Sequence, residues 1–276
     1  MPSTSSNERD IPSDVCVYDD PSTKTLNIEQ IVAYLRDLFP PVDFHSRGEF
    51  FQHHFGGNLK ELGERIARTK VRNVSAEFES FNPLPGEVRF EENLLGSPER
   101  RISGILYDAP RLQLVLRDLL PSKELSFGTV HIVFTPRLFG TYDGGDRRYH
   151  ARVILCGYPS MISTSGIVEA PAKPREFYLT RQAIRATGTD LPAEILEEKI
   201  EGRFLDYDDD RLADVMKGYA AQALFYSITR EPFCDDPRCR LFNAHWQEEV
   251  LEAQLGEQEF CSRHASIIEE IAQKQP

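Results

Sequence analysis

No stretch of the 276-residue sequence approaches the roughly 20 consecutive apolar residues that a membrane-spanning helix requires. The N-terminal residues 1–13 are polar, rich in serine and proline, and lack the apolar core of a secretory signal peptide. We therefore expect a disordered lead and a cytoplasmic protein without a membrane partner.

A surplus of basic charge is also missing. Lys and Arg number 32 against 44 Asp and Glu, which gives a net charge of −12 at pH 7. Because an acidic surface repels a phosphate backbone, nucleic acid is not expected as a general partner. The sequence also lacks a glycine-rich phosphate-binding loop and the Gly-x-Ser-x-Gly pattern of serine hydrolases.

Cysteines are few, but three of the five fall within 31 residues near the C-terminus. Cys234 and Cys239 form a Cys-x4-Cys pair, and Cys261 and His264 form a Cys-x2-His pair after a spacer of 21 residues. Two close pairs are typical of a tetrahedral zinc site, because each short loop directs two ligands at one ion. The spacing predicts a structural zinc, and the alternative is three buried cysteines with a surface histidine.

Hydrophobic periodicity predicts an α/β protein with a mixed sheet and flanking helices. Strand and helix patterns alternate over the first part of the chain, an order typical of parallel strands. Strands are predicted at 15–18, 42–45, 129–134, 149–155 and 161–168. Helices are predicted at 28–38, 49–54, 59–69, 109–120, 180–187, 192–200, 209–229, 244–255 and 262–272. Prolines and glycines in 82–101 indicate loops around a short strand at 88–90, and a soft boundary within one domain of residues 14–276.

The cysteine pattern near the C-terminus resembles that of the archaemetzincins, a family of zinc-dependent proteases. In that family a Cys-x4-Cys-x-Met stretch and a later Cys-x2-Cys pair bind a structural zinc. Here His264 stands in place of the last cysteine and Leu241 in place of the methionine. The resemblance covers about 209–264 and implies a metzincin-like C-terminal half, with the zinc linking the helical part 209–276.

The catalytic half of the family's motif is missing. In the family, His-Glu-x-x-His-x-x-Gly-x-x-His ends just before the first cysteine. The three histidine positions are Ala223, Ser227 and Phe233 here, the glutamate position is Leu224, and the glycine position is Arg230. Metal-assisted hydrolysis needs an open zinc with a bound water and a nearby base. We therefore expect a catalytically degenerate protein that binds or scaffolds, with residues 209–229 as an ordinary core helix.

A hydrolase that uses a different polar site is the alternative. Its candidate residues surround the predicted strand ends, where loops often carry binding groups; they are His131, Arg137, His150, Glu169, Lys173 and Arg175. If the two strands that flank the turn at 143–146 pair around its middle, His131 and His150 lie near each other. The other interpretation is a set of solvated charges at strand ends.

The other histidines and cysteines predict no site. Adjacent His53 and His54 point different ways, and such neighbours rarely share one ion. Cys16 and Cys156 lie in apolar strand-like runs, so we expect reduced core residues of an intracellular protein.

Overall fold

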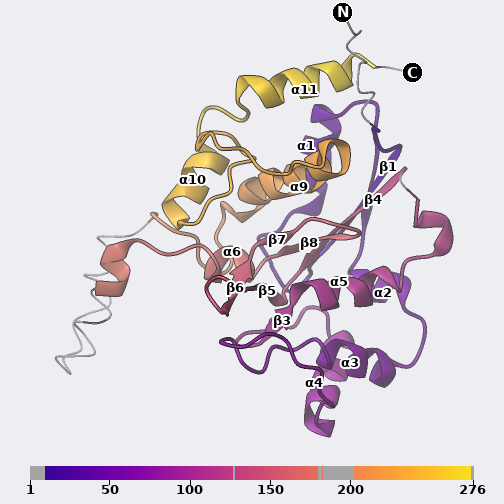
Figure 1. Cartoon of the computed structure of the whole chain (residues 1–276). Coiled ribbons are helices and arrows are strands. Elements are labelled where there is room, and N and C mark those ends of the chain that lie inside the picture. The colour runs from indigo at the N-terminus through magenta and orange to yellow at the C-terminus, as the bar shows by residue number, and fades with distance from the viewer. Residues whose placement is uncertain (1–9, 127, 180–181, 183–201, 275–276) are drawn as a thin grey trace, which may run out of the picture.

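The chain folds around a five-stranded sheet with the strand order β2-β1-β4-β8-β7 (Figure 1). The computed structural model describes residues 10–126, 128–179, 182 and 202–274. The strands are β1 (Asp14–Tyr18), β2 (Asp43–Arg47), β4 (Thr129–Thr135), β7 (Ile154–Leu155) and β8 (Ser160–Ser163). Strand β1 pairs in parallel with β2 and β4, and β4 pairs in parallel with β8, whereas β7 runs antiparallel to β8. The predicted α/β class with a mixed sheet is confirmed.

Helices cover both faces of this sheet, because successive residues of a strand point to opposite sides. Val15 and Val17 of β1 lie in one hydrophobic core, and Cys16 and Tyr18 lie in the other. The helices of the first core are α1 (Ile28–Leu38) and α9 (Leu212–Thr229), and those of the second are α2 (Phe50–His54), α3 (Leu59–Ala67) and α5 (Ala109–Arg117). Figure 1 accordingly shows α1 and α9 on the opposite side of the sheet from α2 and α5.

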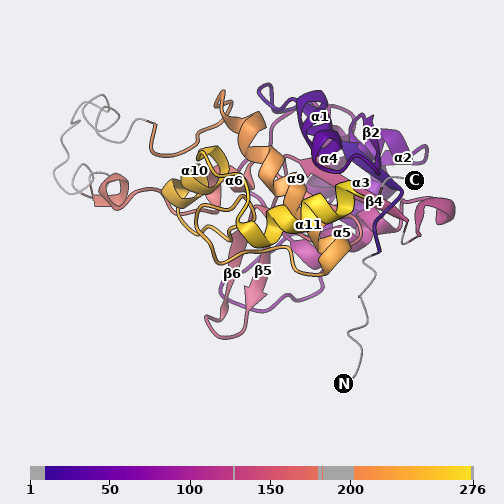
Figure 2. The ribbon, with the colours of Figure 1, turned by 90° about the horizontal axis from the view of Figure 1, so that it is seen from above.

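Two further helices complete the C-terminal part, α10 (Gln247–Leu255) and α11 (Ser262–Ala272). Helix α10 packs on α9. Helix α11 lies above α9 in Figure 1 and passes across it in Figure 2, and the ring of Phe225 on α9 meets the ring of His264 on α11 at a centroid distance of 5.3 Å. The C-terminal helices therefore join the core through α9.

A smaller sheet lies beside the first, in the order β3-β5-β6. Its strands are β3 (Leu106–Asp108), β5 (Leu138–Asp143) and β6 (Arg148–Arg152). The turn at 143–146 closes a hairpin of β5 and β6, as its Gly-Gly pair predicts, but β5 itself was not predicted. The short helices η1 (Ser122–Glu124) and α6 (Gly166–Glu169) stand before β4 and after β8.

The prediction of loops around a strand at 88–90 is wrong, because helix α4 (Pro85–Leu95) occupies this stretch. Pro85 lies in the first turn, where a missing N–H costs nothing, and Gly96 ends the helix. The Glu87 carboxylate accepts a hydrogen bond from the backbone N–H of Leu84 at 2.7 Å and caps the start. Helix α4 packs against α3.

Smaller differences concern segment ends. The strand predicted at 161–168 stops at Ser163, and α6 forms its second half. Two predicted helices lie outside the described residues, apart from residue 182; they are those at 180–187 and 192–200. The same holds for the first nine residues of the lead. Within the part of the chain that the structure describes, no helix has the length and apolar character needed to cross a membrane.

Candidate metal centre

Cys234 and Cys239 lie in the loop of residues 234–242, directly after α9. The backbone N–H of Cys234 donates to the carbonyl of Leu241 at 2.8 Å, and that of Cys239 donates to the carbonyl of Asp236 at 3.0 Å. The N–H of Asp236 points at the Cys234 sulfur, 3.4 Å away. The loop is thus closed on itself, and it holds the two sulfurs in fixed directions.

Cys261 and His264 reach the same place from the start of α11. Cys261 is the N-cap residue of this helix and His264 lies in its first turn, so both side chains point at the loop. The Cys234 and Cys261 sulfurs are 3.8 Å apart. The Nδ1 atom of His264 is 3.2 Å from the Cys261 sulfur and 3.5 Å from the Cys239 sulfur.

The four ligand atoms lie within 4.8 Å of one another. Ligands about 2.0–2.3 Å from one tetrahedral ion are about 3.3–3.8 Å apart, so the observed separations fit one metal ion. Burial raises the pKa of Cys239 to about 12 and lowers the pKa of His264. The buried Cys239 thiol therefore keeps its proton unless a cation replaces it, whereas the neutral imidazole is already the form that binds metal.

The carbonyl of Arg240 ties the loop to the surrounding helices. It accepts from the side-chain amide of Gln254 on α10 at 2.9 Å and from that of Gln222 on α9 at 3.3 Å. The Arg240 N–H donates to the carbonyl of Glu259, two residues before Cys261, at 2.8 Å. The centre therefore stands where α9, α10 and α11 meet.

Residues 11–271 match the model of the probable metallopeptidase family DUF6775. The chain belongs to this family. Comparisons with curated proteins and with solved structures gave no match. Membership supports the metallopeptidase part of the sequence resemblance, and a Cys/His cluster suited to a metal agrees with it.

Helix α9 is a core helix at the positions that correspond to the catalytic zinc ligands of the archaemetzincins. Ala223 and Leu224 are fully buried, and the Ser227 hydroxyl donates to the carbonyl of Ala223 at 3.3 Å. Phe233 lies beyond the helix and is 41% exposed. Arg230 ends the helix in the left-handed conformation, with φ of 64°.

Replacing Arg230 with glycine is expected to raise the free energy of unfolding by about 1 kcal/mol, because a side chain in the left-handed region costs roughly that much. Urea denaturation at pH 7 measures the change. The matched control is Arg89→Gly in the exposed part of α4, where glycine should destabilise by about 1 kcal/mol relative to a good helix former. Equal destabilisation by both substitutions would contradict the backbone assignment at position 230.

A cleft of about 440 Å³ lies beside α9. Strand β7 and its neighbours line one wall, Tyr219 and Gln222 of α9 line another, and residues 242–245 line a third. Strand β7 is the last strand of the five-stranded sheet. The Gln222 side chain is 1% exposed, and its Oε1 atom has no hydrogen-bond partner. The cleft therefore has an edge strand in its wall.

The structure does not pair the strands that would bring His131 and His150 together. His131 lies on β4 of the large sheet, whereas His150 lies on β6 and pairs with Thr141 of β5. The signal for β5 between them is weak in the sequence, so the hairpin partner of β6 was assigned wrongly.

Three other candidates of this polar set, Glu169, Lys173 and Arg137, have partners of their own. Glu169, at the end of α6, accepts a hydrogen bond from the Tyr207 hydroxyl. The Lys173 ammonium lies over the rings of Phe177 and Phe204, at 4.8 and 4.1 Å from their centroids. Arg175 begins a short helical stretch at 175–179. Arg137 is buried against the Glu91 carboxylate at 3.2 Å.

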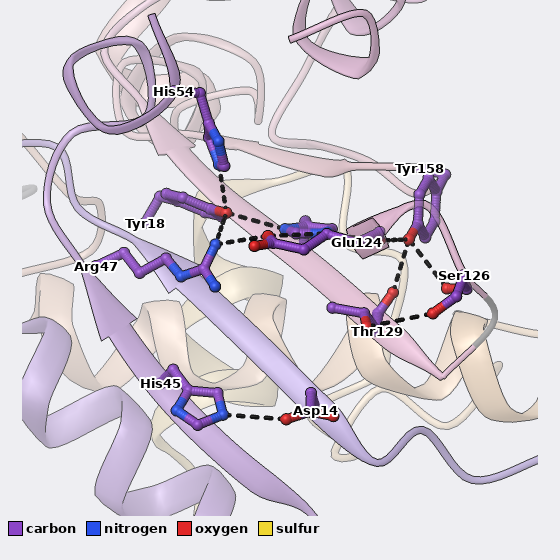
Figure 3. A network of polar contacts seen from close by, with 10 residues as sticks. Asp14, Tyr18, His45, Arg47, His54, Glu124, Ser126, Thr129 and Tyr158 are labelled. Carbon is purple, nitrogen blue, oxygen red and sulfur yellow. Dashed lines mark hydrogen bonds and ion pairs between the residues drawn. The ribbon is translucent and has the colours of Figure 1, made fainter. Parts of the chain in front are cut away.

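A polar network that sequence reasoning missed lies on the second face of the large sheet (Figure 3). The Tyr18 hydroxyl is 2.7 Å from Nε2 of His54 and 3.0 Å from Nδ1 of His131. The Arg47 guanidinium donates to this hydroxyl at 2.7 Å and to the Glu124 carboxylate at 2.8 Å. Burial lowers the pKa of His54 to about 4 and also lowers that of His131, so both rings are neutral at pH 7. Only the register of β1, β2 and β4 reveals this cluster.

Proposed function

We propose that this member of the probable metallopeptidase family holds a structural zinc at Cys234, Cys239, Cys261 and His264, and acts as a binding or scaffold protein. The observation that carries the proposal is the convergence of these four ligand atoms within 4.8 Å, beside a helix without catalytic ligands. We also propose that this chain descends from an archaemetzincin-like peptidase and has itself lost the catalytic zinc.

The ligand set favours zinc and a structural role. Three sulfurs and one imidazole nitrogen suit Zn²⁺, which accepts tetrahedral Cys₃His sites. Four protein ligands leave no open position for water or substrate. An ion bound here would stabilise the C-terminal helices and would not take part in turnover.

The chemistry at α9 argues against peptide hydrolysis by the metzincin route. Leu224 cannot take a proton from water, and the Ala223 and Phe233 side chains offer no lone pair to zinc. Without the ion, no Lewis acid lowers the pKa of a bound water to about 7. The whole mechanism is therefore missing at this place.

The cleft beside α9 supports a binding role. An extended polypeptide segment can pair with the outer edge of an edge strand through backbone hydrogen bonds. Strand β7 offers such an edge beside the cleft. We propose an extended peptide segment as the ligand of this cleft.

A peptide library, read for both cleavage and retention, tests the function. With added zinc we expect no cleavage above that of a chelated control, and retention of a subset of peptides. Introducing Ala223→His, Leu224→Glu and Ser227→His together should not restore cleavage, because Ala223 and Leu224 are buried in the core. Cleavage that is sensitive to chelator and survives purification to homogeneity would contradict the degenerate assignment.

A cleft-filling variant tests the binding half of the proposal. Ala244→Trp places a large ring in the cleft wall and should abolish retention of the bound peptides. Leu114→Trp, on the 55% exposed Leu114 of α5, is the control and should retain them. Equal retention by both variants would show that the cleft is not the binding site.

The alternative of a hydrolase with its own site around His131, His150, Glu169, Lys173 and Arg175 makes a different prediction. Such an enzyme would cleave library peptides, or other substrates, in Ala244→Trp as well as in the unmodified chain.

A further inference from the structure

The face of the large sheet that points away from α9 carries a second group of ligand-type side chains. Cys16 on β1 and His131 on β4 are direct partners in the parallel register, so their side chains project on the same side. Glu124, the last residue of η1, approaches from the loop that leads into β4. One ligand atom from each of the three residues lies within 4.8 Å of the other two.

We propose that Cys16, Glu124 and His131 form a second metal site, which binds a divalent transition-metal ion of the zinc class and keeps one coordination position open. The donor set is one sulfur, one carboxylate oxygen and one imidazole nitrogen, all of which are ligands that zinc accepts. Three protein ligands, in place of four, leave room for a water or an anion.

The distances allow this ion with small movements. The His131 Nε2 atom is 4.0 Å from a Glu124 carboxylate oxygen. Two ligands about 2.0–2.2 Å from a tetrahedral ion are about 3.4 Å apart, so the pair closes by roughly half an ångström on binding. Glu124 provides this movement, because its side chain is 19% exposed and it is the last residue of the short helix η1.

The hydrogen bonds around His131 are those of a metal-bound histidine. Such a ring usually donates its other N–H to an oxygen, which fixes its tautomer and orientation. With Nε2 on the ion, Nδ1–H of His131 donates to the Tyr18 hydroxyl at 3.0 Å. Tyr18 then accepts from His131 and Arg47, and donates to Nε2 of His54 at 2.7 Å. In this arrangement the Tyr18 hydroxyl accepts two hydrogen bonds and donates one (Figure 3).

The backbone carbonyl of Glu124 also remains satisfied when the ion binds. The His131 Nε2 atom lies 3.3 Å from this carbonyl oxygen. The Tyr158 hydroxyl lies 2.5 Å from the same oxygen and can donate to it in either state. Moving Nε2 to the metal therefore leaves no buried carbonyl without a donor.

The charges of the group balance a divalent cation. Binding replaces the S–H bond of Cys16 with a sulfur–metal bond and releases the proton to solvent, which gives a thiolate beside the Glu124 carboxylate. These two negative charges match the two positive charges of the ion. The Arg47 ion pair at 2.8 Å falls on Oε2 of Glu124, the same oxygen that lies 4.0 Å from His131 Nε2, so the carboxylate would ligate the ion through its remaining lone pairs.

Cobalt(II) added to the zinc-loaded full chain tests the proposal, because thiolate ligation of Co²⁺ gives a charge-transfer absorption band. We expect about one Co²⁺ per chain for a single three-ligand site, with a band that is lost in Cys16→Ser. Glu124→Gln should weaken Co²⁺ binding by about 10-fold or more. Cys156→Ser changes a cysteine outside both ligand groups and should keep the full band.

Circular dichroism and retention of the C-terminal zinc establish that each variant is folded. If Cys16→Ser does not fold, Glu124→Gln decides, because this side chain is partly exposed and its loss of charge leaves the core packing intact. A folded chain that takes up no Co²⁺, or a band of equal strength in Cys16→Ser and Cys156→Ser, would overturn the proposal.

Discussion

Replacing Cys261 with alanine is expected to lower the free energy of unfolding by on the order of 5 kcal/mol, the range reached when a structural metal is lost. For a domain of this size each kcal/mol shifts the melting temperature by about 2–4 °C, so the shift should be roughly 10–20 °C. The physical reason is that an ion held by the four proposed ligands would join the 234–242 loop to the start of α11, and three remaining ligands would bind it far less tightly. Chelation of the unmodified chain should reproduce the loss.

Differential scanning fluorimetry and limited proteolysis measure this effect. The control is Cys156→Ala, a cysteine that lies outside the cluster and should change the melting temperature much less. Protease should cut Cys261→Ala between α9 and α11, since the loop then lacks its connection. An unchanged melting curve with intact C-terminal helices would show that the four residues do not hold a structural ion.

Replacing Glu91 with alanine is expected to cost about 3–5 kcal/mol, because two buried cations then lose their counter-charge. The Glu91 carboxylate is fully buried on α4 and lies 2.8 Å from the Lys70 ammonium and 3.2 Å from the Arg137 guanidinium. The Tyr107 hydroxyl donates to it at 2.7 Å. Removal of the carboxylate leaves these buried groups without their shared acceptor.

Urea denaturation at pH 7 compares this variant with Glu64→Gln. Glu64 pairs with Arg68 on the neighbouring α3 at 2.6 Å, but both side chains are nearly half exposed. Loss of such a surface pair costs about 0.5 kcal/mol or less. If the two variants lost equal stability, the buried ion cluster would not be the element that fixes α4 on the domain.

Local signals predicted many helices and strands of this protein. The periodic apolar stripe and the Asn27 cap place α1 at its predicted bounds, and the prolines that follow it stop the helix. Helix α4 was missed because Pro85 and Gly86 are typical of loops, and only packing on α3 shows that this proline starts a helix. The weak pattern of β5 concealed the true partner of β6.

The candidate metal centre could be selected from sequence because each pair of its ligands is local. The four-residue gap of the first pair and the two-residue gap of the second keep both side chains of each pair close enough to bind one ion, independently of the rest of the fold. The structure then brings together the first pair, in the loop that follows α9, and the second pair, at the start of α11. The spacing does not show which helices connect the two pairs of ligands.

The second group of ligand-type residues could not be found in this way. Cys16 and His131 are more than 100 residues apart in the sequence, and each lies in a strand that is apolar around it. Their approach depends on the parallel register of β1 and β4, in which a shift of one residue would turn each side chain to the other face.

The sequence by itself determined the α/β class, the parallel order of the first strands, and the four-residue cluster at the C-terminus, because periodicity and short spacings are local properties. Tertiary structure alone decided the burial of Glu91, the cleft beside α9 and the network around Tyr18. Those features require contacts between distant segments, which form only when sheet register and helix packing bring these segments together.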